Sequence, residues 1–122
     1  MYGKIILCGF VAVWLTGINA YGQTEETLRG IWVNEAGTRK VEFRQAVNAW
    51  TGQLIWAKDN SRLRPGDTLF ENLSWDGRSF NGKLIAPRTT APCSIVIISQ
   101  DKIEITGSKG GMSKSVLWTR VK

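Results

Sequence analysis

The sequence predicts an all-β protein, a small eight-stranded antiparallel up-and-down barrel that follows an N-terminal signal peptide. Short segments alternate polar and apolar residues, which is the period of a strand with one wet face and one dry face. Turn-forming residues separate these segments at close intervals, and no long stretch carries an apolar stripe at helical spacing. An open sandwich is the alternative arrangement of the same strands.

Residues 1–22 are predicted to be an export signal. A single positive charge precedes an apolar run over residues 5–15, which is too short to span a bilayer, and the small residues Ala20 and Gly22 offer cleavage sites. A buried N-terminal helix is the alternative. Residues 23–122 are enough for one domain, which we expect to be periplasmic or secreted and to have no transmembrane segment.

Eight segments of this domain have the pattern of strands. The alternation is clearest at residues 40–44 and 102–106. Closure of eight strands into a barrel would remove the exposed edges that favour aggregation. In chain order the segments are residues 28–34, 40–44, 53–57, 68–75, 79–85, 93–98, 102–106 and 115–121.

The connections predict that neighbouring strands are antiparallel, because links of a few residues cannot return to a parallel start. Asp76-Gly77 is the strongest turn signal, since a tight hairpin turn needs the positive φ that this pair supplies. Residues 87–92 are expected to be irregular, because proline donates no amide hydrogen to a ladder. The other expected connections are hairpins at 35–37 and 100–101, a looser glycine-rich one at 107–113, and a long loop at 58–67.

The first and last strands carry a resemblance. Gly30 and Trp32 form a G-x-W motif, and Trp118 and Arg120 end the last strand. The set resembles the lipocalin and calycin signature, in which a tryptophan near the barrel mouth is covered by an arginine from the final strand. A guanidinium over an indole ring is a favourable cation–π contact of about 0.5 to 2 kcal/mol. The resemblance implies that these four residues are a structural signature of a lipocalin-like barrel.

Residues 28–121 also resemble the bacterial family of unknown function known as DUF2147. The resemblance implies an exported protein with a lipocalin-like barrel and brings no established activity. Ala86 stands where the family usually has aspartate, so a role of that aspartate would not carry over. The matching elements are residues 30–32, the strand pair around Val41 and 52–56, Asp59-Asn60 with Arg64-Pro65, and residues 82–87, 105–107 and 118–121.

The composition argues against several enzyme classes. The chain contains no histidine, which removes Ser-His-Asp and Cys-His arrangements and histidine metal ligands. Cys93 is the only cysteine outside the export signal, and we expect a buried, inert thiol at the start of an apolar strand. The sequence has no phosphate-binding loop, dinucleotide fingerprint, C-x-x-C or calcium loop, so we expect no cofactor and no metal site.

A set of aromatic residues suggests a ligand site inside the barrel. Alternation places Trp50 and Trp56 on one strand face, near Phe43 on the dry face of the preceding strand. The same alternation places Glu71 in phase with Trp75, so the carboxylate points inward if that face of the strand is the dry one. The candidate ligand-binding residues are therefore Phe43, Trp50, Trp56, Glu71 and Trp75. A packed core with no cavity is the alternative.

These features predict an exported, non-enzymatic barrel that binds a small hydrophobic or anionic amphipathic ligand. The net charge of +6 falls to +5 once Lys4 is removed, which favours an anionic partner. The basic residues are dispersed, so no nucleic-acid role is expected. One alternative is a filled barrel that acts as a protein- or polysaccharide-interaction module of the cell envelope, and another is an enzyme built around Glu71 or Cys93. The basic residues considered are Arg39, Lys40, Arg44, Lys58, Arg62 and Arg64.

Overall fold

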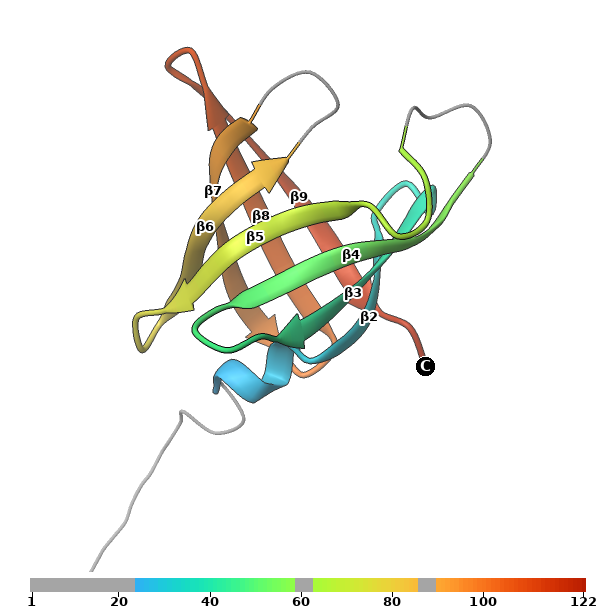
Figure 1. Cartoon of the computed structure of the whole chain (residues 1–122), viewed down its shortest axis with the longest axis horizontal. Coiled ribbons are helices and arrows are strands. Elements are labelled where there is room, and N and C mark those ends of the chain that lie inside the picture. Colours follow the sequence, from blue (N-terminus) through green and yellow to red (C-terminus); the bar gives the residue numbers. More distant parts are fainter. Residues whose placement is uncertain (1–23, 59–62, 86–89) are drawn as a thin grey trace, which may run out of the picture.

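The alternating segments of the sequence fold into eight strands that close on themselves as one barrel (Figure 1). Each strand pairs with its neighbours in the chain, and the last strand pairs with the first. This confirms the predicted up-and-down barrel and excludes the open sandwich. The computed structural model describes residues 24–58, 63–85 and 90–122.

The elements follow one another with short connections. The predicted export signal lies outside the described residues, as do Arg62 and the family-like positions 59–60 and 86–87. In chain order the elements are the 3-10 helix η2 (Glu25–Leu28) and the strands β2 (Gly30–Asn34), β3 (Arg39–Gln45), β4 (Trp50–Ala57), β5 (Thr68–Trp75), β6 (Ser79–Ile85), β7 (Thr90–Ser99), β8 (Lys102–Lys109) and β9 (Met112–Arg120).

Two connections differ from the sequence-based expectation. The looser loop expected at residues 107–113 is wrong, because the β8–β9 ladder continues to a pair between Lys109 and Met112. Only Gly110 and Gly111 remain as the turn, with φ of +59° and +80°, a conformation that glycine adopts at little cost.

The hairpin expected at Asp76-Gly77 is confirmed, with the amide of Asp76 donating to the carbonyl of Ser79 at 3.1 Å.

The irregular stretch expected at residues 87–92 is also partly wrong. Strand β7 begins at Thr90, and Pro92 pairs with Lys83 of β6 within the ladder. The pairing of β7 with β8 begins only at Cys93. A proline is tolerated here because this stretch of β7 has a ladder on one side only.

A β-bulge changes which side of β4 faces the interior. Lys40 of β3 pairs with Trp56, whereas the next residue, Val41, pairs with Leu54, so Ile55 has no partner of its own. The extra residue reverses the alternation, and the Trp56 side chain is 41% exposed while Leu54 is buried. The prediction that Trp56 shares the inner face with Trp50 is therefore wrong.

A second irregularity has the same effect on Glu71 of β5. Phe70 is buried, so its neighbour Glu71, which pairs with Lys83, belongs to the outer phase. The register then shifts, and Asn72 adopts a φ of +55°, which brings Leu73 to the inner face. The prediction of an inward-pointing Glu71 is wrong, because the bulge breaks the alternation on which it depended.

The two ends of the barrel differ. The helix η2 lies across one end, and the β8–β9 hairpin projects at the other (Figure 1). Leu28, which the sequence placed at the start of the first strand, is the last residue of η2 and is completely buried. Among the described residues, no helix is both long enough and apolar enough to cross a membrane.

Candidate functional site

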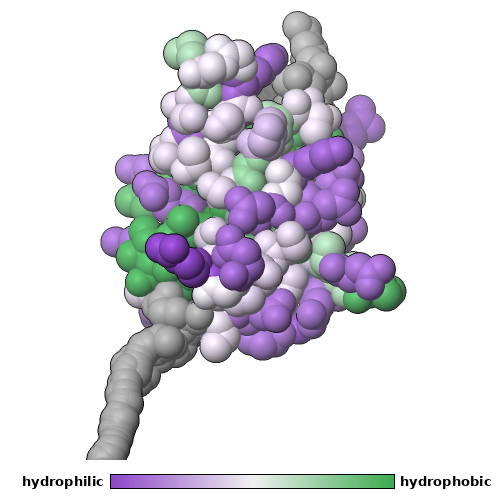
Figure 2. Space-filling model, turned by 90° about the vertical axis from the view of Figure 1, so that its left-hand side faces the viewer, coloured by the Kyte–Doolittle hydropathy of each residue, from purple (hydrophilic) through white to green (hydrophobic). Residues whose placement is uncertain are grey.

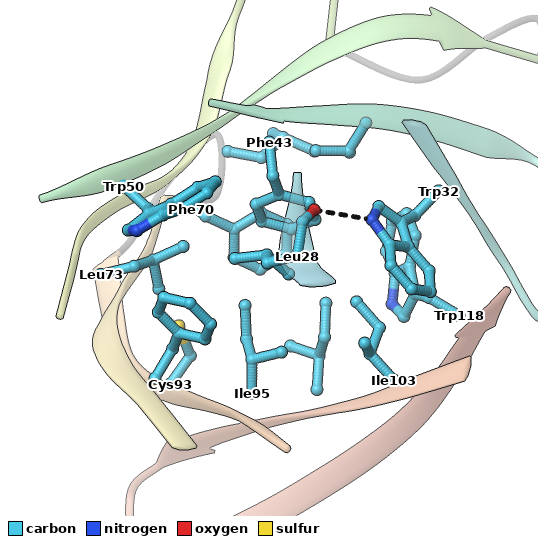
Figure 3. Packing of buried hydrophobic residues seen from close by; sticks show 14 of the residues in the cluster. Leu28, Trp32, Phe43, Trp50, Phe70, Leu73, Cys93, Ile95, Ile103 and Trp118 are labelled. Carbon is cyan, nitrogen blue, oxygen red and sulfur yellow. Dashed lines mark hydrogen bonds between the residues drawn. The ribbon is translucent and has the colours of Figure 1, made fainter. Parts of the chain in front are cut away.

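The half of the barrel next to η2 is filled by side chains. Apolar residues from strands all around the barrel point toward one another there, with Leu28 among them (Figure 3). Trp50 packs edge-on against Phe80, with ring centres 5.8 Å apart, and Phe43 packs against Phe70 at 5.4 Å. This part of the interior is a packed core and leaves no room for a ligand.

Polar groups fasten η2 over this end. The indole Nε1–H of Trp32 donates to the carbonyl of Leu28 at 2.9 Å, and that of Trp50 donates to Glu25 at 2.9 Å. Arg29 lies over the Trp50 ring, 5.0 Å from its centre. Buried indole groups thus have their hydrogen-bond partners in the segment that covers them, which closes this end of the barrel.

The predicted pairing of Trp32 and Arg120 is present at the same end. The guanidinium carbon of Arg120 lies 4.4 Å from the centre of the Trp32 ring, and the two residues are register partners between β2 and β9. The guanidinium also donates to the carbonyls of Thr27, Arg29 and Gln100, at 2.6, 2.9 and 2.8 Å. The expected place of this pair was near the barrel mouth, and that is wrong, because η2 closes the end where it lies.

The opposite half of the barrel holds a cavity of about 850 Å³ that opens to solvent. This volume lies in the range of small-molecule sites, about 300 to 1,000 Å³. Side chains from β5, β6, β8 and β9 form an apolar lining, and the Trp118 ring packs edge-on against Phe70 with centres 6.2 Å apart. The apolar lining residues of these four strands include Leu69, Phe70, Leu84, Ile105, Val116 and Trp118.

The rim of the cavity carries positive charge. Arg39, Lys109 and Lys114 line it, and Glu35 is the one acidic residue among the lining residues that the structure describes. Arg39 is two residues from the buried Val41, so it continues the inner face of β3. The rim is therefore cationic above an apolar interior.

None of the five predicted ligand-binding residues lines this cavity. Phe43 and Trp50 lie in the packed core, and Trp75 is half-buried against Phe80, with ring centres 4.9 Å apart. Trp56 and Glu71 belong to the outer face for the reasons given above. Sequence alternation showed which residues could point inward but not at which height of the barrel the interior is filled.

Sequence reasoning missed the residues that do line the cavity, although one signal was present. In β9 the inner phase runs from Trp118 through Val116 to Lys114, and in β3 it runs from Val41 to Arg39. A cation that continues an apolar inner phase at the end of a strand marks the point where the interior meets solvent. Trp118, predicted as a structural residue, is part of the cavity wall.

The thiol of Cys93, which the sequence offered as a possible nucleophile, is not activated in the structure. Burial raises the pKa of the Cys93 thiol to about 11, so the thiol is protonated and a weak nucleophile at neutral pH. Cys93 belongs to the buried cluster and is not among the lining residues, although its register partner Gly107 lines the cavity. No group of three or more potential metal ligands occurs among residues 24–58, 63–85 and 90–122.

Comparison with solved structures identifies the fold. The chain is similar to protein HP1028 from Helicobacter pylori, described as belonging to the lipocalin family, with a TM-score of 0.62 and 21% sequence identity over 78% of this chain and 83% of that one. It is also similar to a redesigned β-barrel, with a TM-score of 0.52 and 12% identity over 82% of this chain and 96% of that one. No protein-family profile and no curated protein sequence matches the chain. The fold is thus lipocalin-like.

Proposed function

We propose that the protein is an exported, non-enzymatic barrel that binds a small hydrophobic or amphipathic molecule in the cavity at its open end. The observation that carries this proposal is an apolar cavity of about 850 Å³ above a packed and closed half. Such a cavity favours an apolar guest, because burial of apolar surface contributes about 25 cal/mol per Å². The similarity to a lipocalin-family protein supports a small-ligand site in this fold.

We also propose that the protein catalyses no reaction and that it is exported from the cytoplasm. Cys93 is not among the lining residues, its thiol is protonated at neutral pH, and the described lining residues contain no nucleophile activated by a base. The apolar run and small residues at the N-terminus support export to the periplasm or beyond. The motifs shared with the DUF2147 family support the same location, and membership in that family stays a prediction.

Titration with an uncharged hydrophobic dye whose fluorescence rises in apolar surroundings tests the proposal. Gly107 lines the cavity, and a Cβ placed on it would meet only Leu84, at 3.5 Å. A Gly107→Leu variant should therefore project a branched side chain into the cavity without a clash at its Cβ, obstruct the dye there and weaken its binding about tenfold or more. Thr106→Leu places the same side chain on the outer face of β8 and should change the affinity less than about twofold.

The melting temperature of each variant shows whether it remains folded. Absence of saturable dye binding to the folded wild-type protein would refute the cavity as a binding site. Equal binding by wild type and a folded Gly107→Leu variant would refute it as well, because the dye would then lie elsewhere.

One observation favours a second candidate function, the recognition of a protein or polysaccharide by the outer face. Trp56 is 41% exposed, and the Lys40 amine lies 5.3 Å from the centre of its ring. Exposed aromatic rings beside cations are common anchors in interfaces. The face of the molecule in Figure 2 is mostly hydrophilic, and hydrophobic residues gather mainly at its lower left. A Trp56→Ala variant that loses a partner but still binds the dye would support this second function.

A further inference from the structure

Three cations from separate strands line the open end of the cavity. Arg39 begins β3, Lys109 ends β8, and Lys114 lies on β9 opposite Gly107. Lys114 and Gly107 are register partners, and both line the cavity together with Arg39 and Lys109. Arg39 follows the β2–β3 turn at the level of Trp118, whereas Lys114 and Lys109 lie farther along β9 and β8 toward the projecting hairpin, so the three cations line the open end at different heights.

Their strand phase distinguishes these cations from the other basic residues. Lys83 and Lys102 also lack a salt bridge among the described residues, but each belongs to the outer phase of its strand, where water solvates the charge. Lys114 and Arg39 instead continue an inner phase that is apolar deeper in the barrel. A strand pattern selected only for folding would place charges on the outer face.

None of the three rim cations forms a salt bridge within the part of the chain that the structure describes. The salt bridges there join Arg29 to Glu26, Arg44 to Glu42, and Arg120 and Lys122 to Asp101. The three positive charges of the rim face only the single negative charge of Glu35 among the lining residues. A positive potential at the entrance attracts and holds an anion.

We propose that the ligand is an amphiphile with one apolar chain and an anionic carboxylate or phosphate head group. This inference rests on the proposed function, since it concerns the same cavity. The apolar chain lies against Trp118, Phe70 and Ile105, and the head group stays at the rim, where the positive charges of Arg39, Lys109 and Lys114 attract it. The head group keeps part of its hydration there, so its charge is not buried unpaired.

Isothermal titration calorimetry with four probes that share one alkyl chain tests this inference on the folded full chain. The probes are laurate, dodecyl phosphate, dodecanol and dodecyltrimethylammonium, each kept below its micelle-forming concentration. Laurate and dodecyl phosphate should bind about tenfold more tightly than dodecanol, and the cationic probe most weakly. A preference between the two anions identifies the head group as a carboxylate or a phosphate.

A pair of double variants locates the effect. Arg39→Gln with Lys114→Gln should remove most of the preference for the anions and leave dodecanol binding within about twofold of the wild type. Lys83→Gln with Lys102→Gln removes the same charge from the outer face and should preserve the preference. Added salt should weaken the binding of the anions and not of dodecanol, because exposed charges are screened.

The outcomes separate the two proposals. Equal affinity for laurate and dodecanol, or an anion preference that survives the rim variant, overturns the head-group assignment while the cavity remains a binding site. Failure of all four probes to bind a protein with a native melting temperature overturns the proposed function, and the head-group assignment with it.

Discussion

A Cβ atom placed on Gly30 would lie 2.9 Å from Nη1 of Arg120, and the φ of Gly30 is +124°. The missing side chain leaves room for the guanidinium to reach the carbonyl of Arg29, to which Nη1 donates at 2.9 Å. The glycine and the arginine are therefore parts of one arrangement, which joins the first strand, the last strand and the residues that follow η2.

Gly30→Ala should destabilise the protein by about 1 to 3 kcal/mol, because it combines an unfavourable φ with a displaced guanidinium. Urea denaturation followed by tryptophan fluorescence measures the change. Gly107→Ala is the matched control and should cost less than about 0.5 kcal/mol, since its new methyl group meets only Leu84, at ordinary contact distance. Equal losses in the two variants would contradict the structural role of Gly30.

Arg120→Lys should cost about 2 to 3 kcal/mol, even though it conserves the charge. Lysine lacks the planar fork that donates to three carbonyls and covers Trp32. Arg44→Lys, in an exposed salt bridge with Glu42, should change the free energy of unfolding by less than about 0.5 kcal/mol. The same denaturation experiment compares the two, and a small loss in Arg120→Lys would show that charge alone matters at this position.

Trp50→Ala and Trp56→Ala should behave differently although both residues lie on β4. Trp50 is 1% exposed in the packed core, so its removal should cost about 3 to 5 kcal/mol through lost burial and a cavity. Trp56 lies on the outer face, and its removal should cost less than about 1 kcal/mol. Thermal unfolding of both variants measures the difference, and similar losses would contradict the bulge at Ile55.

Cys93 should react slowly in the folded protein. Its pKa of about 11 lies well above that of a free thiol, so at pH 8 the reactive thiolate is about a hundredfold rarer than in the unfolded chain, and burial limits access further. Iodoacetamide labelling followed by peptide mass spectrometry distinguishes Cys93 from Cys8. Denatured protein serves as the control, and equal rates with and without denaturant would contradict the burial.

Asp76 should stabilise the fold only when it is ionised. The backbone amides of Ser79 and Arg78 donate to its carboxylate and lower its pKa below the usual range. A lowered folded-state pKa contributes stability that is present above the unfolded pKa of about 3.9 and is lost as the pH falls through the folded value.

Asp76→Asn should therefore lower the melting temperature at neutral pH, and the difference from wild type should shrink in strongly acidic solution. Glu104→Gln, on the outer face of β8, controls for the loss of one negative charge. A difference that persists unchanged at low pH would show that the carboxylate charge has no part in the turn.

The strands could be predicted from the sequence because alternation is a local property. Val41 and Phe43 face inward as expected, and so does Trp50. The bulges at Ile55 and Asn72 depend on how two strands meet, and a single strand carries no sign of them. They reverse the phase of Trp56 and Glu71, which is why these two candidate residues were misplaced.

The position of the cavity could not be predicted for a different reason. Which half of the barrel is filled depends on η2, whose Leu28 adds to the core at one end and whose backbone accepts a hydrogen bond from Trp32. The sequence suggested a strand there instead. Because the end next to η2 is filled, the alternation of β9 places Lys114, Val116 and Trp118 along the wall of the cavity at the opposite end.

Because η2 covers one end of the barrel, it also restricts the path by which a ligand could reach the cavity. Among the described residues, η2 covers the end of the barrel opposite the cavity, so a ligand of the proposed site would both enter and leave at the end where Arg39 and Lys114 lie. Changes at the rim would alter loading and unloading rates together.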